Sequence, residues 1–575
     1  KSCFVPYVEG FYSLCLEVGV NGPLAWLHGT RRKLDEGQHP TSELLEGAAY
    51  LEAVAKAAKA ADKKKAQKWA AVLGNLDTFD PAADLVRSQE LDALFLEVPL
   101  KHLSHTSAVQ TLWVERVKAR FSTWYEFFPR SASQVPGQHG TFADCEAQLP
   151  RVAEMGFDTL YFPPVHPIGE VNRKGKNNST TAAAGDVGSP WGIGSVHGGH
   201  MALHPELGDE ASFRSLVQKA SELGIEIAMD FALQAAPDHP WVKEHPQWFK
   251  WRPDGTVQYA ENPPKKYQDI LPIYFETPQW KELWAELLKS ALYWVEHFGI
   301  KVFRVDNPHT KPYRFWGWLI REVQKKHPEV LFLAEAFTRP KVMDQLAKQG
   351  FTQSYTYFTW RTSKHELITY MEELTKTERK YYFRPNFWPN TPDINPWNLQ
   401  GANESMYIQR YALAATLSAN MGVYGPVYEF QDSAAVPGKE EYFNSEKYEV
   451  RHWDWGKQTT VSNVMTLINR ARHQHPALQQ TNNLEFLHIA NDALLAFRKW
   501  SLDGTKQCIV VVSLDPHHKQ IGNVQLPSSS ERWPVQSGLK VSDLITGDSY
   551  HWNGQDAYIE LHPAMPVHIF DVQFL

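Results

Sequence analysis

Short apolar runs alternate with longer segments of helical periodicity over most of the chain, from about residue 117 to residue 470. Each run has the length of a buried strand, and strand followed by helix at this cadence predicts a parallel sheet. Eight such units close into a TIM-type barrel, which takes roughly 250 residues or more. We therefore expect an α/β fold with a (β/α)8 barrel over residues 116–475. The clearest runs are Trp124 to Phe128, Thr159 to Phe162, Glu226 to Phe231, Val302 to Asp306, Leu331 to Glu335 and Ser354 to Phe358.

The segments on either side of the barrel have different patterns. Residues 1–40 hold one strand-like stretch, Gly10 to Val20, which is too short for a whole sandwich and predicts an incompletely represented N-terminal β domain. Residues 41–115 place apolar side chains at helix spacing on an alanine-rich background, which predicts a helical insert and linker. Short β-rich runs separated by turn residues predict a C-terminal all-β sandwich over residues 476–575.

The composition narrows the class of partner. Hydrophobic residues make up 43% and charged residues 21% of the chain, as in an ordinary soluble globular protein. The net charge of -7 gives no overall basic field of the kind that nucleic-acid-binding proteins use. No apolar run approaches the ~18 residues that cross a bilayer, and the first residues do not look like a signal peptide. We expect no nucleic-acid partner, no membrane partner and a cytoplasmic location.

The cysteines and histidines give no sign of a metal site. Cys3, Cys15, Cys145 and Cys508 are scattered, without a CxxC pair or zinc spacing, so reduced thiols are expected. The histidines near the C-terminus lack metal-site spacing relative to any carboxylate. The sequence therefore predicts no metal and no cofactor.

Three acidic residues end a strand-like run or follow one closely: Asp306, Glu335 and Asp393. In a barrel such residues converge on one pocket at the carboxyl ends of the strands. Two carboxylates ~5 to 5.5 Å apart perform retaining glycoside chemistry, one as nucleophile and the other as acid and then base. Arg304 lies two residues before Asp306, hence on the same strand face, where a guanidinium keeps a nucleophilic carboxylate ionised. For each carboxylate alone, an ordinary surface acid is the alternative.

These motifs resemble those of the α-amylase superfamily of retaining glycosidases and transglycosylases. Phe303 to Asp306 resembles the nucleophile strand and Ala334-Glu335 the acid/base strand, while Asp230 resembles the motif on strand three. The resemblance implies Asp306 as nucleophile, Glu335 as acid/base, Asp393 as transition-state stabiliser and Arg304 as support for the nucleophile.

The chain departs from the usual superfamily pattern at two positions. Gln234 stands where an Asn-His pair usually follows Asp230, and Thr391-Pro392 replaces the Asn-His before Asp393. Because the missing Asn also helps to bind calcium in many amylases, the departures argue against both ordinary amylase activity and a metal.

Longer strings are similar to those of the α-1,4-glucan:maltose-1-phosphate maltosyltransferases. This resemblance runs from about Trp124 to Tyr448 and implies a barrel with an N-terminal sandwich, a helical insert and a C-terminal sandwich, working as a homodimer. The poorly represented N-terminal sandwich is the main mismatch. The strings are His166 to Gly169, Arg173 to Asn178, Asp186 to Trp191, Glu261 to Asp269, Asp306 to Pro312 and Ser445 to Tyr448.

A phosphorylated donor makes its own demand, since a departing dianion in a water-poor pocket needs cations and amide donors. Lys174 and Lys447 lie in these strings, although a lone lysine is ordinarily a solvated surface residue. The resemblance implies donor contacts from Lys174, Gln234, Tyr267, Asn307, Lys447 and Tyr448.

The sequence thus predicts a retaining transferase with a covalent glycosyl-enzyme intermediate. It moves maltosyl units from a maltose 1-phosphate donor to an α-1,4-glucan acceptor. An amylase-type hydrolase or a trehalose-forming isomerase of the same superfamily is the alternative. A barrel that only binds glucan is a second alternative, against which the intact carboxylates argue. Trp191, Trp360, Trp388 and Trp397 are the tryptophans expected nearest to sugar subsites.

Overall fold

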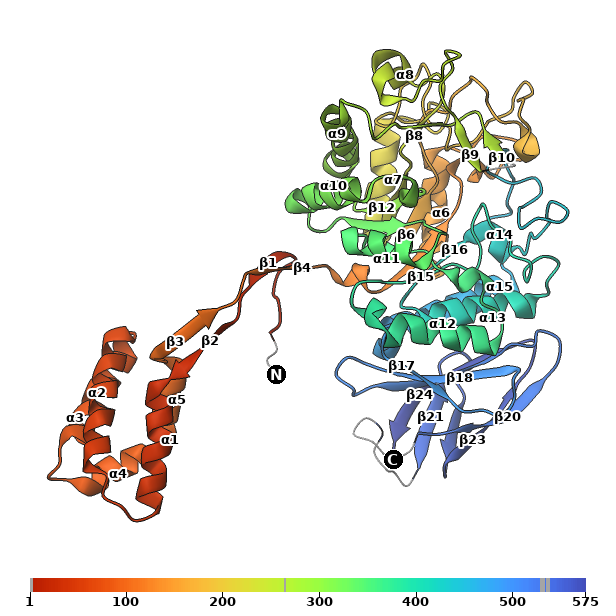
Figure 1. Cartoon of the computed structure of the whole chain (residues 1–575). Coiled ribbons are helices and arrows are strands. Elements are labelled where there is room, and N and C mark those ends of the chain that lie inside the picture. The colour runs from red at the N-terminus through yellow and green to blue at the C-terminus, as the bar shows by residue number, and fades with distance from the viewer. Residues whose placement is uncertain (1–3, 263–264, 528–532, 534–537) are drawn as a thin grey trace. The chain divides into compact units, whose positions relative to one another are not determined.

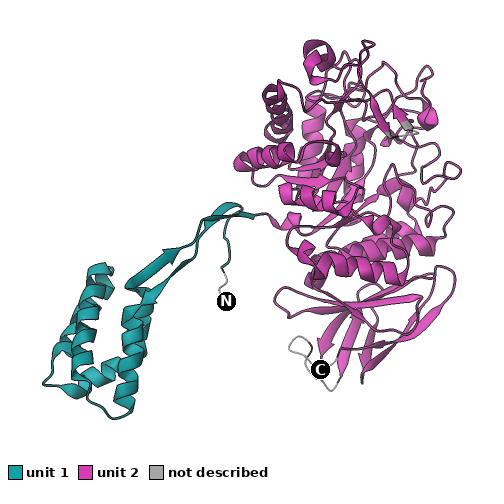
Figure 2. Cartoon of the chain, viewed as in Figure 1, with its two compact units in different colours: residues 1–114 teal, residues 115–575 magenta. Residues whose placement is uncertain are grey.

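The computed structural model describes residues 4–262, 265–527, 533 and 538–575. Two segments named above lie outside the described residues. They are Lys1 to Cys3 at the start of the sequence, and Pro263-Pro264 within the string Glu261 to Asp269. The chain divides into two compact units, residues 1–114 and residues 115–575 (Figure 2).

The first unit is a helical bundle with two short β-ribbons. The strands pair antiparallel as β1 (Gly10–Leu14) with β4 (Gln110–Val114), and β2 (Glu17–Asn21) with β3 (Lys101–Thr106). The single expected stretch from Gly10 to Val20 is therefore two strands. The helices are α1 (Gly22–Asp35), α2 (Thr41–Ala57), α3 (Ala60–Gly74), α4 (Phe79–Arg87) and α5 (Gln89–Glu97).

Helix α1 begins at Gly22, well before residue 41, where the helical pattern of the sequence predicts the first helix. The Asn21 side chain accepts a hydrogen bond from the Leu24 N–H, and Pro23 lies in the first turn. Both are standard helix-start signals, because they satisfy or remove backbone donors that the helix leaves free. Leucine, valine and alanine side chains from all five helices form the buried core of this unit.

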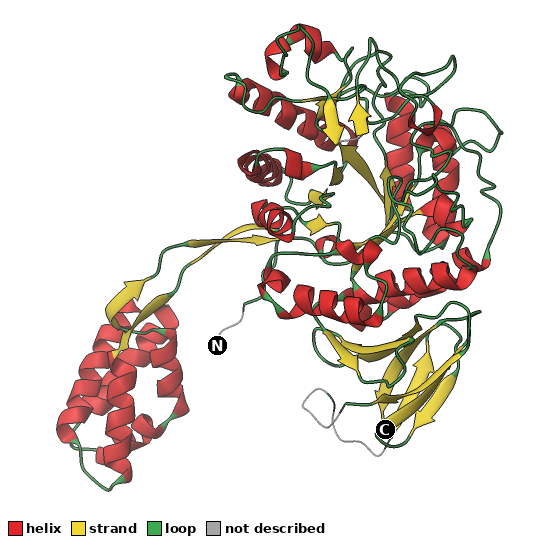
Figure 3. Cartoon of the chain, turned by 45° about the vertical axis from the view of Figure 1, so that its right-hand side comes forward, coloured by secondary structure: helices red, strands yellow, loops and turns green. Residues whose placement is uncertain are grey.

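The second unit contains an eight-stranded parallel sheet in the order β14-β13-β12-β7-β6-β5-β16-β15. A further parallel bridge from Ser354 to Pro385 joins its two ends, so the sheet closes into the expected barrel (Figure 3). Its strands are β5 (Ser122–Glu126), β6 (Thr159–Phe162), β7 (Glu226–Phe231), β12 (Val302–Val305), β13 (Leu331–Ala334), β14 (Gln353–Ser354), β15 (Asn386–Phe387) and β16 (Asn420–Tyr424).

One predicted strand was wrong in length. The run Ser354 to Phe358 is a strand only at Gln353–Ser354, and the 3-10 helix Tyr357–Trp360 follows it. The apolar side chains of that helix, including Phe358, still pack into the core, so burial rather than extended backbone explains the apolar pattern.

Helices surround the barrel on its outer face (Figure 1). Short strands outside the barrel pair as β8 (Gln234–Ala235) with β11 (Leu271–Pro272) and β9 (Ala260–Asn262) with β10 (Lys265–Tyr267). The helices are α6 (Phe142–Glu154), α7 (Glu210–Glu222), α8 (Pro240–Glu244), α9 (Trp280–Phe298), α10 (Tyr313–Lys326), α11 (Pro340–Gln349), α12 (Lys364–Lys376), α13 (Glu404–Leu417), α14 (Gly425–Glu429) and α15 (Thr460–Gln474).

The C-terminal region is the expected antiparallel β structure. A six-stranded sheet in the order β17-β18-β19-β24-β21-β22 and the pair β20-β23 contribute side chains to one shared core, as in a sandwich. The other face of the larger sheet packs against the barrel, where α13 contacts β19 and β24. The strands are β17 (Leu484–Leu487), β18 (Leu494–Trp500), β19 (Gln507–Ser513), β20 (Gln520–Gln525), β21 (Leu539–Asp543), β22 (Ser549–Trp552), β23 (Asp556–Leu561) and β24 (Val567–Phe574).

Candidate active site

The guanidinium of Arg304 binds three carboxylates at the carboxyl ends of adjacent strands. Arg304 Nη1 lies 2.8 Å from Asp230 Oδ2 and 3.1 Å from Asp306 Oδ1, and Nη2 lies 2.8 Å from Glu335 Oε1. The parallel register places Arg304 of β12 beside Asp230 of β7, and Asp306 projects from the same face two residues later. The structure therefore brings the predicted nucleophile, the predicted acid/base and the predicted supporting arginine together.

Asn307 turns the chain directly after Asp306. Its φ of 41° is left-handed, a conformation that asparagine adopts more readily than most residues. The Asn307 backbone N–H donates to Glu335 Oε2 at 3.3 Å, and its side-chain Nδ2 donates to Asp306 Oδ2 at 3.4 Å. One residue thus contacts both carboxylates.

Burial changes the protonation of these groups. It raises the pKa of Glu335 to about 8, against the opposing effect of Arg304, and the negative charge of Asp306 adds to the rise. Burial likewise raises the pKa of Asp230 to about 7. Burial disfavours the charge of Arg304, but the surrounding carboxylates hold its pKa well above the ordinary value. Near neutral pH, Glu335 therefore carries a proton that it can donate as a general acid.

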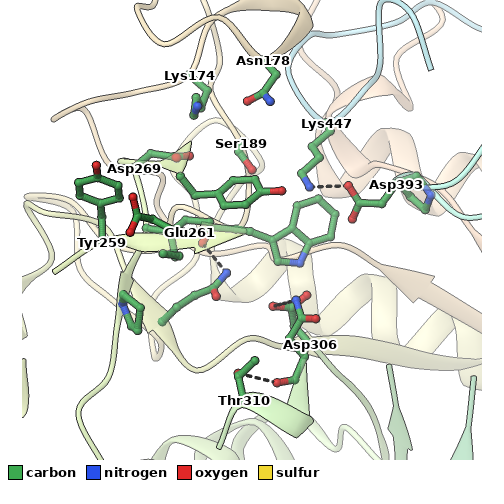
Figure 4. A pocket seen from close by; sticks show the side chains of 18 of the residues that line it. Lys174, Asn178, Ser189, Tyr259, Glu261, Asp269, Asp306, Thr310, Asp393 and Lys447 are labelled. Atoms are coloured by element: carbon green, nitrogen blue, oxygen red, sulfur yellow. Dashed lines mark hydrogen bonds and ion pairs between the residues drawn. The ribbon is translucent and has the colours of Figure 1, made fainter. Parts of the chain in front are cut away.

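Asp306 opens into a cavity of about 810 Å³. Arg304 and Glu335 are buried next to Asp306, with side chains 3% and 8% exposed, and are not among the residues that line the cavity. In Figure 4, Lys174 and Lys447 lie on the side of the cavity away from Asp306. The predicted residues that line the cavity are Lys174, Gln234, Tyr267, Asp306, Asn307, Asp393, Lys447 and Tyr448.

Lys447 and Asp393 form an ion pair in the cavity wall. Lys447 Nζ lies 2.5 Å from Asp393 Oδ1 and 5.1 Å from the centre of the Trp191 ring. Burial opposes the charge of Lys447, but the Asp393 carboxylate raises the lysine pKa well above its ordinary value. Lys447 is therefore a permanent cation beside the ring of Tyr448, at 6.0 Å.

The remaining predicted donor contacts come from the loops around the cavity. Lys174 is buried and its Nζ donates to the Lys266 carbonyl oxygen at 3.1 Å. Burial lowers the pKa of Lys174, and Asp269 counteracts this effect. Gln234 Nε2 donates to the Trp191 carbonyl oxygen at 3.2 Å, which fixes the side chain that replaces the usual Asn-His pair.

Two residues that line the cavity, Asp269 and Lys311, are not among the residues predicted from the sequence. Asp269 lines the cavity beside Lys174, and Lys311 donates from Nζ to the carbonyl oxygens of Asp306 and Asn307 at 3.4 and 3.2 Å. Both lie within the motif strings, which was the available signal. Of the four tryptophans expected near subsites, Trp191 lines the cavity, whereas Trp388 is 1% exposed inside the barrel.

The sequence is similar to known proteins along its whole length. A relative from Chlorobaculum tepidum, named alpha-1,4-glucan:maltose-1-phosphate maltosyltransferase, is 49% identical over 580 residues, which cover 100% of this chain and 86% of the relative. The chain belongs to the α-1,4-glucan:maltose-1-phosphate maltosyltransferases. A relative of the same name from Mycolicibacterium smegmatis is 44% identical over 588 residues, which cover 100% of this chain and 83% of the relative. The family resemblance predicted from the motif strings is confirmed.

Family models support this membership at both ends of the chain. The model described as domain N/S of alpha-1,4-glucan:maltose-1-phosphate maltosyltransferase matches residues 1–116, and the model described as "GLGE, C-terminal" matches residues 486–572. The domain N/S match extends to two residues beyond the first compact unit of this maltosyltransferase.

Solved structures confirm the barrel fold of this maltosyltransferase. A maltogenic alpha-amylase from Thermotoga neapolitana superposes with a TM-score of 0.62 at 17% identity, covering 80% of this chain and 100% of that chain. An alpha-amylase from Geobacillus thermoleovorans gives 0.59 at 15% identity, covering 80% and 99%. At this identity the likeness concerns the fold.

Three further features concern metals, thiols and membranes. The described residues contain no group of three or more histidine, cysteine or acidic side chains arranged to hold a metal ion. Cys15, Cys145 and Cys508 are free thiols. Within the described parts of the chain, every helix is too short or too polar to span a bilayer.

Proposed function

We propose that the chain transfers maltosyl units from α-maltose 1-phosphate to the non-reducing end of α-1,4-glucan, with net retention and release of phosphate. The observation that carries this proposal is that the Asp306 carboxylate and the two cations Lys174 and Lys447 line the same cavity. A carboxylate nucleophile serves any retaining enzyme of this fold, but two lysines in the wall, Lys174 buried and Lys447 partly exposed, suit a donor that bears an anion.

In the first step, Asp306 attacks the anomeric carbon of the donor. The bond from that carbon to the phosphate oxygen breaks, a bond to an Asp306 oxygen forms, and Glu335 gives its proton to the departing phosphate. The raised pKa of Glu335, about 8, supplies this proton near neutral pH. Arg304 contacts Asp306 at 3.1 Å and holds the nucleophile in place, and Asp393 holds the donor sugar in the transition state.

In the second step, Glu335 acts as base. It takes the proton of the acceptor 4-hydroxyl as that oxygen attacks the anomeric carbon and the bond to Asp306 breaks. Two inversions give net retention, and the glucan grows by one maltosyl unit. Side chains carry both steps, so we propose that the reaction needs no cofactor or metal.

The phosphate contacts are proposed for Lys174, Lys447, Tyr267 and the Asn307 amide, with Gln234 and Tyr448 beside the donor sugar. Lys447 is charged at neutral pH through its ion pair with Asp393. A homodimer, which the family resemblance implies, and a cytoplasmic location remain predictions. Light scattering on the purified chain measures its mass in solution and so tests the homodimer.

The test incubates the protein with maltose 1-phosphate and a short maltooligosaccharide, and measures product lengths by mass spectrometry together with released phosphate. We expect products spaced by two hexoses, with one phosphate per addition. Single-hexose spacing, free maltose as the main product, or activity on starch or trehalose without phosphate would instead favour the hydrolase or isomerase.

A further inference from the structure

A second cavity lies at the opposite end of the barrel from the carboxylates. It has a volume of about 350 Å³, within the usual range of small-molecule sites. Arg120 in its wall precedes β5, Pro385 precedes β15, and Asn420 begins β16. All its lining residues belong to the second unit. Because Asp306 and Glu335 follow the carboxyl ends of their strands, this lower cavity is separate from the active site.

The wall of the lower cavity is strongly basic. It contains the side chains of Arg116, Arg120, Lys380 and Arg384, against one acid, Glu115. Glu115 pairs with Arg384, whose side chain is nevertheless 43% exposed. Arg116 is neutralised from outside the cavity by Glu226, with contacts of 2.6 and 2.8 Å. Among the residues that the structure describes, Arg120 and Lys380 are thus the cations of this cavity without an acidic partner.

Arg120 combines a buried side-chain donor with a neighbouring positive charge. Its Nε is buried and has no hydrogen-bond partner among the described residues. Burial lowers the pKa of Arg120, and the neighbouring charge of Arg384 lowers it further. A buried donor without an acceptor, next to a like charge, is costly unless a bound anion satisfies it.

The rest of the wall offers neutral contacts. The Asn482 amide donates from Nδ2 to the Lys380 carbonyl oxygen at 3.1 Å, which holds the loop in place beside the cavity. Tyr381 is 79% exposed, with Lys380 Nζ 4.9 Å from its ring centre. An exposed ring beside cations suits the apolar face of a sugar that carries a charged group.

We propose that the lower cavity binds a phosphate dianion through Arg120, Arg384 and Lys380, either as free inorganic phosphate or as the phosphate group of a sugar phosphate. Arginine presents its donors as a planar fork that matches phosphate oxygens. The charges of Arg120 and Lys380 balance the dianion, and Arg384, which is already paired with Glu115, adds a donor at the same wall. This site is independent of the proposed transfer reaction, whose phosphate contacts lie at the other end of the barrel.

The test titrates inorganic phosphate into the full chain by isothermal calorimetry, in the background Lys174→Met/Lys447→Met, which removes the two lysines proposed to bind phosphate in the active site. We expect binding of one phosphate per chain. Adding Arg120→Gln should weaken this binding by about 10- to 100-fold, the loss of a charge-assisted contact. Arg321→Gln, at an exposed arginine of α10, is the matched control and should leave the affinity unchanged. Equal phosphate binding with and without Arg120→Gln overturns the proposal.

Glucose 6-phosphate, titrated in parallel, separates the two sources. If glucose 6-phosphate binds more tightly than inorganic phosphate, and Tyr381→Ala lowers its affinity to that of inorganic phosphate, the cavity is assigned to a sugar phosphate. Equal affinity of the two assigns it to free phosphate.

A measurement on the unaltered protein covers the case in which Arg120→Gln does not fold. Phenylglyoxal modifies accessible arginines, and peptide mass spectrometry reads the modified positions. Phosphate should protect Arg120 and Arg384 while Arg321 reacts as before. Unchanged reaction of Arg120 at saturating phosphate contradicts the site.

Discussion

Lys447 Nζ lies 2.5 Å from Asp393 Oδ1, so the cation proposed for the phosphate is paired with the carboxylate proposed for the donor sugar. The two residues lie 54 positions apart in sequence and meet in the cavity wall. This pair keeps Lys447 charged. In the proposed reaction it gives the donor's phosphate and sugar one shared point of contact.

Lys447→Ala and Lys174→Ala should each lower kcat/KM for maltose 1-phosphate by about 10- to 100-fold, the loss of one charge-assisted contact. Binding of neutral glucan should change little. Lys176→Ala is the control, because Lys176 is exposed and lies two residues from Lys174. Steady-state kinetics with varied donor, together with glucan binding, measures both effects. Equal losses toward donor and glucan would mean that these lysines serve the fold.

Asp306→Ala should abolish turnover, since no other carboxylate opens from β12 into the cavity.

Glu335→Ala should slow the second step by roughly 10²- to 10⁴-fold, the usual contribution of a general base. Phosphate leaves with little help from an acid, so a maltosyl adduct should accumulate in Glu335→Ala. Intact-protein mass spectrometry detects the adduct. Failure to trap any adduct on Asp306 with a fluorinated donor would count against the retaining mechanism.

Stability should fall with rising pH because of Glu335. Its pKa is about 8 in the folded protein against an ordinary value of 4.5, so the folded state binds more protons than the unfolded state between these values. Raising the pH through this window therefore destabilises the protein, by at most ~1.4 kcal/mol per pH unit from this residue. Below pH 4.5 both states are protonated and the effect is absent.

Glu335→Gln removes this proton and should flatten the decline of the free energy of unfolding between pH 5 and pH 8. Urea denaturation at several pH values measures it. Glu378→Gln, at an exposed glutamate, should keep the slope of the unaltered protein. An identical slope in Glu335→Gln would show that Glu335 is ionised throughout this range.

Arg304→Met should destabilise the protein by about 3 to 5 kcal/mol, because it leaves buried carboxylates without their cation. Arg304→Lys should recover only part of this loss, since an ammonium group cannot reproduce a fork that binds three carboxylates. Urea denaturation measures both variants. Arg314→Met, at an exposed position of α10, is the control. If Arg304→Met and Arg314→Met lower the free energy of unfolding by similar amounts, the loss at Arg304 does not come from its buried carboxylate partners.

Local pattern was enough to predict the barrel and its carboxylates. Strands β6 and β7 match the predicted runs, because a buried parallel strand is apolar along its whole length. Asp306 and Glu335 were predicted because the residue after a barrel strand faces the active-site end in any barrel. Motif strings also gave the family, since they depend on sequence alone.

Other features depended on tertiary contacts. Strand β15 has two residues, Asn386–Phe387, too few for any periodicity to show. Helix α1 was placed too late because the β-like stretch before it obscured the cap at Asn21. Protonation of Glu335 depends on burial next to Asp306, which no local pattern records.

Local patterns along the chain are enough to predict the barrel, the order of the carboxylates along it and the family. Three charge arrangements become visible in the folded chain alone: Arg304 contacts three carboxylates, Lys447 pairs with Asp393, and Arg120 and Arg384 share a cavity at the other end of the barrel. The physical reason is that periodicity reports which side of an element is buried, whereas charge pairing depends on distances between side chains that chain closure brings together.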